Sequence, residues 1–276
     1  MRVIIIILTT VFISCQSINT GNYEQLDSVT STLKENSSTL LDSLESLEKE
    51  NYIDAVYNDE KDIYEIKYNI ENENTEIFLD KVFEYRKQLS EINNLLSSYS
   101  SMLLAIATED VSKIQENTTE FITGIRSIEG KPDFNDDQLE VLENLLNEVE
   151  RAYRIEALEK IVENNQSLIE EFSTTALEYI KQLEELTFLI YDKRFADVYE
   201  NYLTEKEKDK LRYLLDLNDE YRRNVNYLKN IKSIYERLPA FHRDIISDTG
   251  FIGYVEHISE DYFQEDISPW TEYIKN

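Results

Sequence analysis

The chain contains one cysteine and two histidines, which are its only thiol and imidazole groups. A di-iron site in a helical bundle requires a Glu-x-x-His pair on each of two helices. The residue three before His242 is Pro239, and the residue three before His257 is Tyr254, so neither histidine fits. The sequence also has no zinc-helix, nucleophile-elbow or phosphate-loop motif. We therefore predict that the protein is not an enzyme and holds no cofactor.

Three groups of side chains could still bind a divalent cation. They are Asp136, Asp137 and Glu140; Asp216, Asn218 and Glu220; and His257, Glu260 and Asp261. The first group fits the start of a helix, where acids favour the positive end of the helix dipole. The second alternates as in a calcium loop but lacks the glycine that such a loop needs, and the third fits an exposed helical face. We predict no metal site, although cation binding by the acidic clusters stays open.

Cys15 ends a short apolar segment at the N-terminus. Arg2 supplies one positive charge, residues 3–13 are mostly apolar, and the small Ser14 precedes the cysteine. These are the three regions of a secretory signal peptide. A membrane-spanning helix needs roughly 20 apolar residues, so this run is too short to span a bilayer. We predict a signal peptide over residues 1–14, and Cys15, as the lone thiol, has no disulfide partner.

The residues Phe12-Ile13-Ser14-Cys15 resemble the lipobox of bacterial lipoproteins. Phe12 stands where leucine is commonest and Ile13 where a small residue is commonest, whereas Ser14 keeps the cleavage position small. The resemblance implies that the chain is cut before Cys15 and that lipid on its thiol anchors the protein to a membrane. By resemblance to Gram-negative lipoproteins, Gln16 favours the outer membrane. An ordinary secreted protein with an incidental cysteine is the alternative.

The composition is strongly acidic but typical of a folded protein. The chain has 56 acidic and 28 basic residues and a formal net charge of -28, so it repels nucleic acid and anionic lipid surfaces. We expect no nucleic-acid partner and no membrane contact other than the lipid. With 41% hydrophobic residues, 19 Tyr and 11 Phe, the chain differs from disordered sequences. Only 5 Gly and 3 Pro are present, which favours an all-α fold over a hairpin-rich β-fold.

Apolar residues recur at helical spacing through most of the chain. The longest seam comprises Phe78, Val82, Tyr85, Leu89, Ile92, Leu96, Tyr99, Leu103 and Ile106. Its steps alternate between four and three residues, which is heptad spacing. Similar seams lie within residues 26–47, 139–153, 172–190 and 214–238. Tyrosines within the seams are predicted to fill the core while their hydroxyls reach the bundle edge, and a tyrosine-lined ligand groove is a lesser alternative.

Local signals mark where the helices begin and end. The seam breaks after Thr108, and Gly130-Lys131-Pro132-Asp133 predicts a hairpin. Thr204 and Glu207 form a capping box that predicts a helix start, and Pro239 predicts the end of that helix. The residues beyond Pro239 are rich in aromatics, and we expect them to pack back on the bundle as a short lid.

We therefore predict an elongated antiparallel bundle of long helices with coiled-coil-like seams and an aromatic-rich C-terminal lid. Residues 15–22 would form the lipidated cysteine and a tether, and residues 23–276 a single domain. The seams could also pair between copies, so monomer and homo-oligomer both stay open.

The predicted function is that of a cell-envelope lipoprotein with a structural or protein-interaction role. In composition and layout the chain resembles helical-bundle envelope lipoproteins of unknown function. A surface adhesin or host-factor-binding lipoprotein is one alternative, and a periplasmic metal or small-ligand binder is another.

Overall fold

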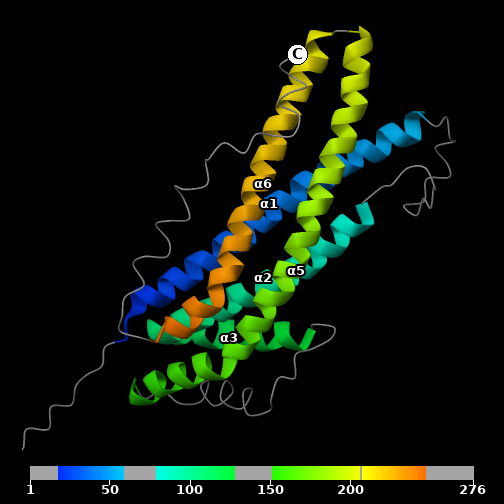
Figure 1. Ribbon diagram of the computed structural model, residues 1–276. Coiled ribbons are helices and arrows are strands. Elements are labelled where there is room, and N and C mark those ends of the chain that lie inside the picture. The colour runs from blue at the N-terminus through cyan, green and yellow to red at the C-terminus, as the bar shows by residue number, and fades with distance from the viewer. Residues whose placement is uncertain (1–17, 59–78, 128–150, 206, 247–276) are drawn as a thin grey trace, which may run out of the picture.

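The computed structural model describes residues 18–58, 79–127, 151–205 and 207–246. All regular secondary structure in these ranges is helical, as predicted. The helices, labelled as in Figure 1, are α1 (Thr20–Asn58), α2 (Leu79–Ala107), α3 (Val111–Ser127), α5 (Arg151–Glu205) and α6 (Lys208–Asp244).

The helices pack as two antiparallel pairs that cross each other (Figure 1). One pair is α1 with α2, and the other is α5 with α6. Helix α6 lies against α1, and α2 lies against α5, while α3 packs on α2. The predicted all-α bundle of long helices is therefore confirmed.

The predicted seams form the core of the bundle. On α2, Val82, Leu89, Leu96 and Leu103 are all buried. On α5 and α6 the buried positions include Ala176, Leu183, Ile190, Leu228, Ile231 and Leu238. Full burial of a leucine or isoleucine side chain contributes about 1.5–3 kcal/mol, so these stripes supply most of the energy that holds the helices together.

A sharp turn reverses the chain between α2 and α3, at the predicted break after Thr108. Glu109 adopts a left-handed backbone conformation with φ of 60°. Asp110 then caps α3, because its carboxylate accepts hydrogen bonds from the Ser112 hydroxyl at 2.7 Å and the Lys113 amide at 3.4 Å. These contacts lower the pKa of Asp110, the Ser112 bond most strongly.

The predicted capping box at Thr204 is wrong. Helix α5 continues to Glu205, and α6 begins at Lys208. The Thr204 hydroxyl donates instead to the carbonyl of Glu200, one turn back in α5, at 3.0 Å. Serine and threonine inside helices commonly bond backward in this way, and Glu207 at the true N-cap makes no side-chain cap.

Pro239 does not end its helix, contrary to the prediction. It lies inside α6, which continues to Asp244. A proline removes one backbone hydrogen bond from a helix, but Phe241 and Ile245 beyond it are buried in the core. The carbonyl of Pro239 also accepts a hydrogen bond from Nε2 of Gln166 on α5, at 3.0 Å. Tertiary packing therefore holds the helix together past the proline.

The predicted tether is shorter than expected at its C-terminal end. Helix α1 begins at Thr20, so residues 20–22 are helical. Asn22 is buried, and its Nδ2 donates to the carbonyl of Ile245 at 3.2 Å. This bond satisfies a carbonyl at the end of α6, where helices leave such groups without an internal partner. It joins the start of α1 to the end of α6.

The remaining boundary predictions lie outside the described residues. They are the signal peptide over residues 1–14, Cys15, the hairpin at residues 130–133 and the aromatic lid beyond Gly250.

Truncating one seam leucine tests the core directly. Leu103 is fully buried, so Leu103→Ala should reduce the free energy of unfolding by about 2–5 kcal/mol through lost burial and the cavity left behind. Leu215→Ala is the matched control, because Leu215 is 43% exposed and its truncation should cost less than about 0.5 kcal/mol. Urea unfolding followed by circular dichroism measures both; equal costs would contradict the assigned seam.

Candidate functional site: a buried histidine and the polar contacts between helices

His242 lies near the end of α6 with its side chain fully buried. Its Nε2 is 2.7 Å from the Tyr99 hydroxyl on α2, and its Nδ1 is 2.8 Å from Oε1 of Gln166 on α5. The Tyr99 ring also packs against the His242 ring at 5.5 Å between centroids, and against Phe121 of α3 at 5.1 Å. The imidazole thus joins α6 to α2 and α5 through side chains that are far apart in the sequence.

The hydrogen bonds around His242 define its tautomer. Nε2 of Gln166 donates to the Pro239 carbonyl, so the amide oxygen of Gln166 faces the imidazole as an acceptor. Nδ1 of His242 therefore carries the proton and donates it to Gln166. Nε2 is then the acceptor for the Tyr99 hydroxyl. Every polar atom of the neutral ring has a partner in this arrangement.

Burial keeps this histidine neutral. It lowers the pKa of His242 from 6.5 to about 4, because a buried imidazolium loses hydration and both ring partners are uncharged. Burial also raises the pKa of Tyr99 well above its usual value. With both nitrogens occupied and no exposed surface, His242 cannot exchange protons with a bound molecule. Its chemistry is that of a structural hydrogen-bonding group.

Other polar contacts cross the core between His242 and the α5–α6 turn. The Tyr235 hydroxyl on α6 donates to Oδ1 of Asn93 on α2 at 2.6 Å, and both residues are buried. Farther along α6, Nδ2 of Asn224 lies 2.8 Å from both the Tyr191 hydroxyl on α5 and Oγ of Ser43 on α1. The Tyr235–Asn93 and Asn224–Ser43 contacts join helices from the two different pairs, whereas Asn224–Tyr191 joins α6 to α5 within one pair.

The predicted position of the tyrosine hydroxyls is therefore correct for only some of them. Tyr85 does reach the edge, where its hydroxyl donates to Gln182 at 2.7 Å. Tyr99 and Tyr235 instead turn their hydroxyls into the core. The sequence did contain a signal that His242 is buried, because this residue continues the seam four residues after Leu238 and seven after Tyr235.

Near the α5–α6 turn, Arg194 of α5 joins the end of α1 to α6. It forms ion pairs with Asp54 and, at 3.6 Å, with Glu50 of α1. Its Nε donates to the Tyr213 hydroxyl of α6 at 3.0 Å, and the guanidinium lies 5.3 Å from the centre of the Tyr213 ring. The Tyr213 hydroxyl in turn donates to Glu50 at 3.2 Å.

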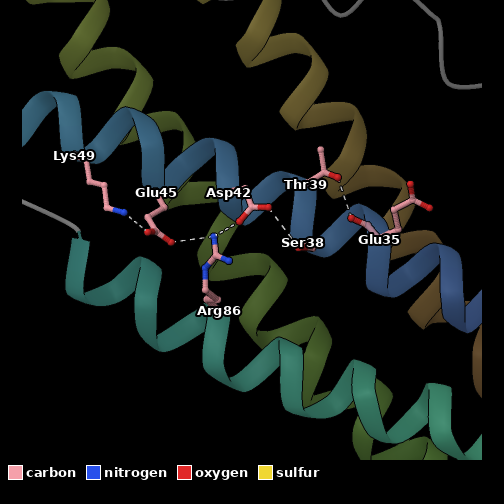
Figure 2. A network of polar contacts seen from close by, with 7 residues as sticks. All are labelled: Glu35, Ser38, Thr39, Asp42, Glu45, Lys49 and Arg86. Carbon is pink, nitrogen blue, oxygen red and sulfur yellow. Dashed lines mark hydrogen bonds and ion pairs between the residues drawn. The ribbon is translucent and has the colours of Figure 1, made fainter.

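A second charged network lies on the outside of the α1–α2 pair (Figure 2). Arg86 of α2 reaches across to Asp42 at 2.6 Å and Glu45 at 3.0 Å on α1, and Lys49 pairs with Glu45. The Asp42 side chain is 63% exposed. Exposed ion pairs of this kind contribute about 0–1 kcal/mol, so they support the α1–α2 contact only slightly.

The candidate cation site at residues 216–220 is not a loop. These residues lie within α6; Asn218 is buried, and Glu220 accepts a hydrogen bond from Ser43 at 2.7 Å. Within the described ranges, no three histidine, cysteine, aspartate or glutamate side chains are placed to bind one metal ion. The groups at 136–140 and 257–261, and the lipidation residue Cys15, lie outside those ranges.

Comparison with protein-family models, curated proteins and solved structures gives no match for this chain. No helix among the described residues is long and apolar enough to cross a membrane. The geometry therefore defines a helical bundle whose buried polar residues connect helices.

His242 predicts a specific pH dependence of stability. Its pKa is lower in the folded protein than the ordinary value of 6.5. The stability contribution of the neutral ring is therefore complete above pH 6.5 and is lost as the pH falls toward 4. The shift of the His242 pKa from 6.5 to about 4 corresponds to a loss of about 3 kcal/mol in the free energy of unfolding between pH 7 and pH 4. Between pH 7 and pH 4, the free energy of unfolding of His242→Gln should therefore fall by about 3 kcal/mol less than that of the wild type. Urea titrations at the two pH values measure this difference.

Tyr85→Phe, a substitution at an exposed contact, is the control for this experiment and should follow the wild-type pH profile. Equal pH profiles for His242→Gln and the wild type would contradict the neutral, buried state of His242.

The Tyr235–Asn93 contact predicts a non-additive pair of substitutions. Tyr235→Phe leaves Oδ1 of Asn93 buried without a donor and should cost about 1–3 kcal/mol. Adding Asn93→Leu removes the unpaired atom, so the double variant should be more stable than the sum of the single effects implies. Tyr85→Phe, at an exposed contact, should change the free energy of unfolding by less than about 0.5 kcal/mol. Additive effects at positions 93 and 235 would contradict the contact.

Proposed function

We propose that the protein is a lipid-anchored component of a bacterial cell envelope whose helical bundle serves a structural or protein-interaction role. The observation that carries this proposal is the N-terminal sequence, in which a charged residue, a short apolar run and Ser14 lead to the lone Cys15. Two or three acyl chains on one cysteine meet the requirement that stable anchoring needs more than one lipid signal. Gln16 supports the outer membrane as the location.

The arrangement of the helices supports a bundle that stands off the membrane. The start of α1 is bonded to the end of α6 through Asn22 and Ile245, and the turn between α5 and α6 lies at the opposite end of α6 (Figure 1). Cys15 is only five residues before Thr20. At 1.5 Å per residue, α6 extends about 55 Å from the anchored end.

The far end of the α5–α6 pair offers apolar side chains to a partner. Leu203 is 53% exposed and Leu215 is 43% exposed, on either side of the turn. Patches of exposed apolar side chains are typical of protein contacts, and these two leucines are candidates for such a contact. The buried polar groups Tyr99, His242, Tyr235 and Asn224, by contrast, already have partners within the bundle. A protein-interaction role therefore suits the described residues better than small-molecule chemistry.

Replacing Cys15 tests the anchor. Cys15→Ser removes the thiol that would carry the lipid, so the variant should move from the detergent phase to the aqueous phase in Triton X-114 partitioning. It should also lose incorporation of a labelled fatty acid. Ser17→Ala, two residues away, is the matched control and should partition like the wild type. Retention of Cys15→Ser in the detergent phase would contradict lipid anchoring at this residue.

A further inference from the structure

The contact between Tyr99 and His242 joins a proton donor to a base inside the core. The Tyr99 hydroxyl lies 2.7 Å from Nε2 of His242, the ring nitrogen that carries no proton. Both side chains are fully buried. Burial raises the pKa of Tyr99 well above its usual value, so the phenol keeps its proton at neutral pH. The pair therefore holds a proton that can move between two enclosed partners.

The geometry provides for this movement when Tyr99 loses an electron, because a phenol that has lost one electron becomes a strong acid. Its proton moves along the hydrogen bond to Nε2 of His242, which leaves a neutral tyrosyl radical and an imidazolium. The Nδ1 proton of that imidazolium still points at Oε1 of Gln166, 2.8 Å away, and the new Nε2 proton points back at the phenoxyl oxygen. Both donors of the charged ring thus have acceptors without any side chain moving.

The position of His242 favours the positive charge that the transfer creates. His242 lies in the last turn of α6, where the negative end of the helix dipole stabilises a cation. The formal net charge of the protein, -28, acts in the same direction. Because the two partners are enclosed, the proton stays between them and returns to Tyr99 when the electron is replaced.

Tyr235 lacks this property although it is also fully buried. Its hydroxyl donates to Oδ1 of Asn93 at 2.6 Å. An amide oxygen is a much weaker base than an imidazole nitrogen, so Asn93 does not take the proton of an oxidised phenol. Among the described residues His242 is the only histidine, and both of its ring nitrogens are occupied. The combination of a buried phenol and an imidazole is thus specific to Tyr99.

We propose that Tyr99 and His242 form a one-electron redox site, at which the bundle holds an oxidising equivalent as a neutral tyrosyl radical. The oxidant is an oxygen-centred radical of the peroxyl class, which takes the electron from Tyr99 and a proton from water and becomes a hydroperoxide. A one-electron reductant such as a thiolate later replaces the electron, and the proton returns from Nε2 to the phenoxyl oxygen. This inference does not depend on the lipid anchor.

An electron can leave Tyr99 although no oxidant touches it. Phe121 of α3 covers the Tyr99 ring, with 5.1 Å between the ring centroids. A helix with its side chains is about 10–12 Å across, so α3 separates the phenol from solvent by roughly that distance. Electrons tunnel across such a layer, whereas a second tyrosyl radical cannot approach to couple with the first. A radical at Tyr99 should therefore outlive radicals on tyrosines at the surface.

Flash oxidation followed by electron paramagnetic resonance tests this expectation. The full chain carrying Cys15→Ser, which removes the only thiol, is oxidised with a photogenerated ruthenium(III) bipyridine complex. After the radicals on surface tyrosines have decayed by coupling, a long-lived tyrosyl signal should remain. Tyr99→Phe should lose this signal. Tyr235→Phe is the matched control, because it removes an equally buried hydroxyl and should keep the signal.

Two further measurements test the role of the imidazole. His242→Gln keeps a hydrogen-bond acceptor but removes the base, so the long-lived signal should be lost while circular dichroism verifies a folded bundle. In the chain labelled with ¹⁵N-histidine, electron–nuclear double resonance should detect a proton shared between the phenoxyl oxygen and a labelled imidazole. This second measurement needs no substitution at the pair, so it decides the question where a variant does not fold.

Three results would overturn the proposal. A long-lived signal of equal size in Tyr99→Phe would place the radical on another residue. An unchanged signal in folded His242→Gln, or a tyrosyl radical without a proton shared with labelled imidazole, would show that His242 does not accept the proton. A tyrosyl signal that decays as fast with Tyr99 present as in Tyr99→Phe would show that the pair does not hold an oxidising equivalent.

Discussion

Three neutral side chains, the buried Tyr99 and His242 and the partly buried Gln166, meet and join α2, α5 and α6. Heptad seams supply most of the buried surface, but a seam displaced by one heptad buries nearly the same apolar area. Such a displacement would separate the imidazole from its phenol and amide partners, and each buried polar group left unpaired costs about 1–3 kcal/mol. The polar contacts therefore select the observed register from a set of similar alternatives.

The same principle extends along the bundle toward the α5–α6 turn. Tyr235 meets Asn93, Asn224 meets Tyr191 and Ser43, and Arg194 meets Asp54, so the two helix pairs are joined at successive levels. In these contacts, the buried polar groups are hydrogen-bonded to one another. The surface of the bundle and the far end of α6 are then the described parts of the molecule available for other contacts, which is the basis of the proposed protein-interaction role.

Much of the fold could be predicted from the sequence because helical periodicity is local. The seams through Leu89 and Leu183 proved to be buried, and the break after Thr108 coincides with the end of α2. Local signals failed where distant contacts outweighed them. Pro239 stays within a helix because residues beyond it pack in the core, and Asn22 is helical because it bonds to Ile245. The partners of His242 lie 143 and 76 residues away, and no local pattern identifies them.

The most direct test replaces the polar contact with apolar residues, in the triple variant Tyr99→Phe/Gln166→Leu/His242→Phe. Buried polar groups often add little net stability relative to well-packed apolar ones, so we expect the variant to stay helical and of similar stability. Calorimetry should nevertheless show a van't Hoff enthalpy well below the calorimetric enthalpy, because several registers become populated. A single two-state transition, as cooperative as that of the wild type, would contradict the claim that this contact fixes the register.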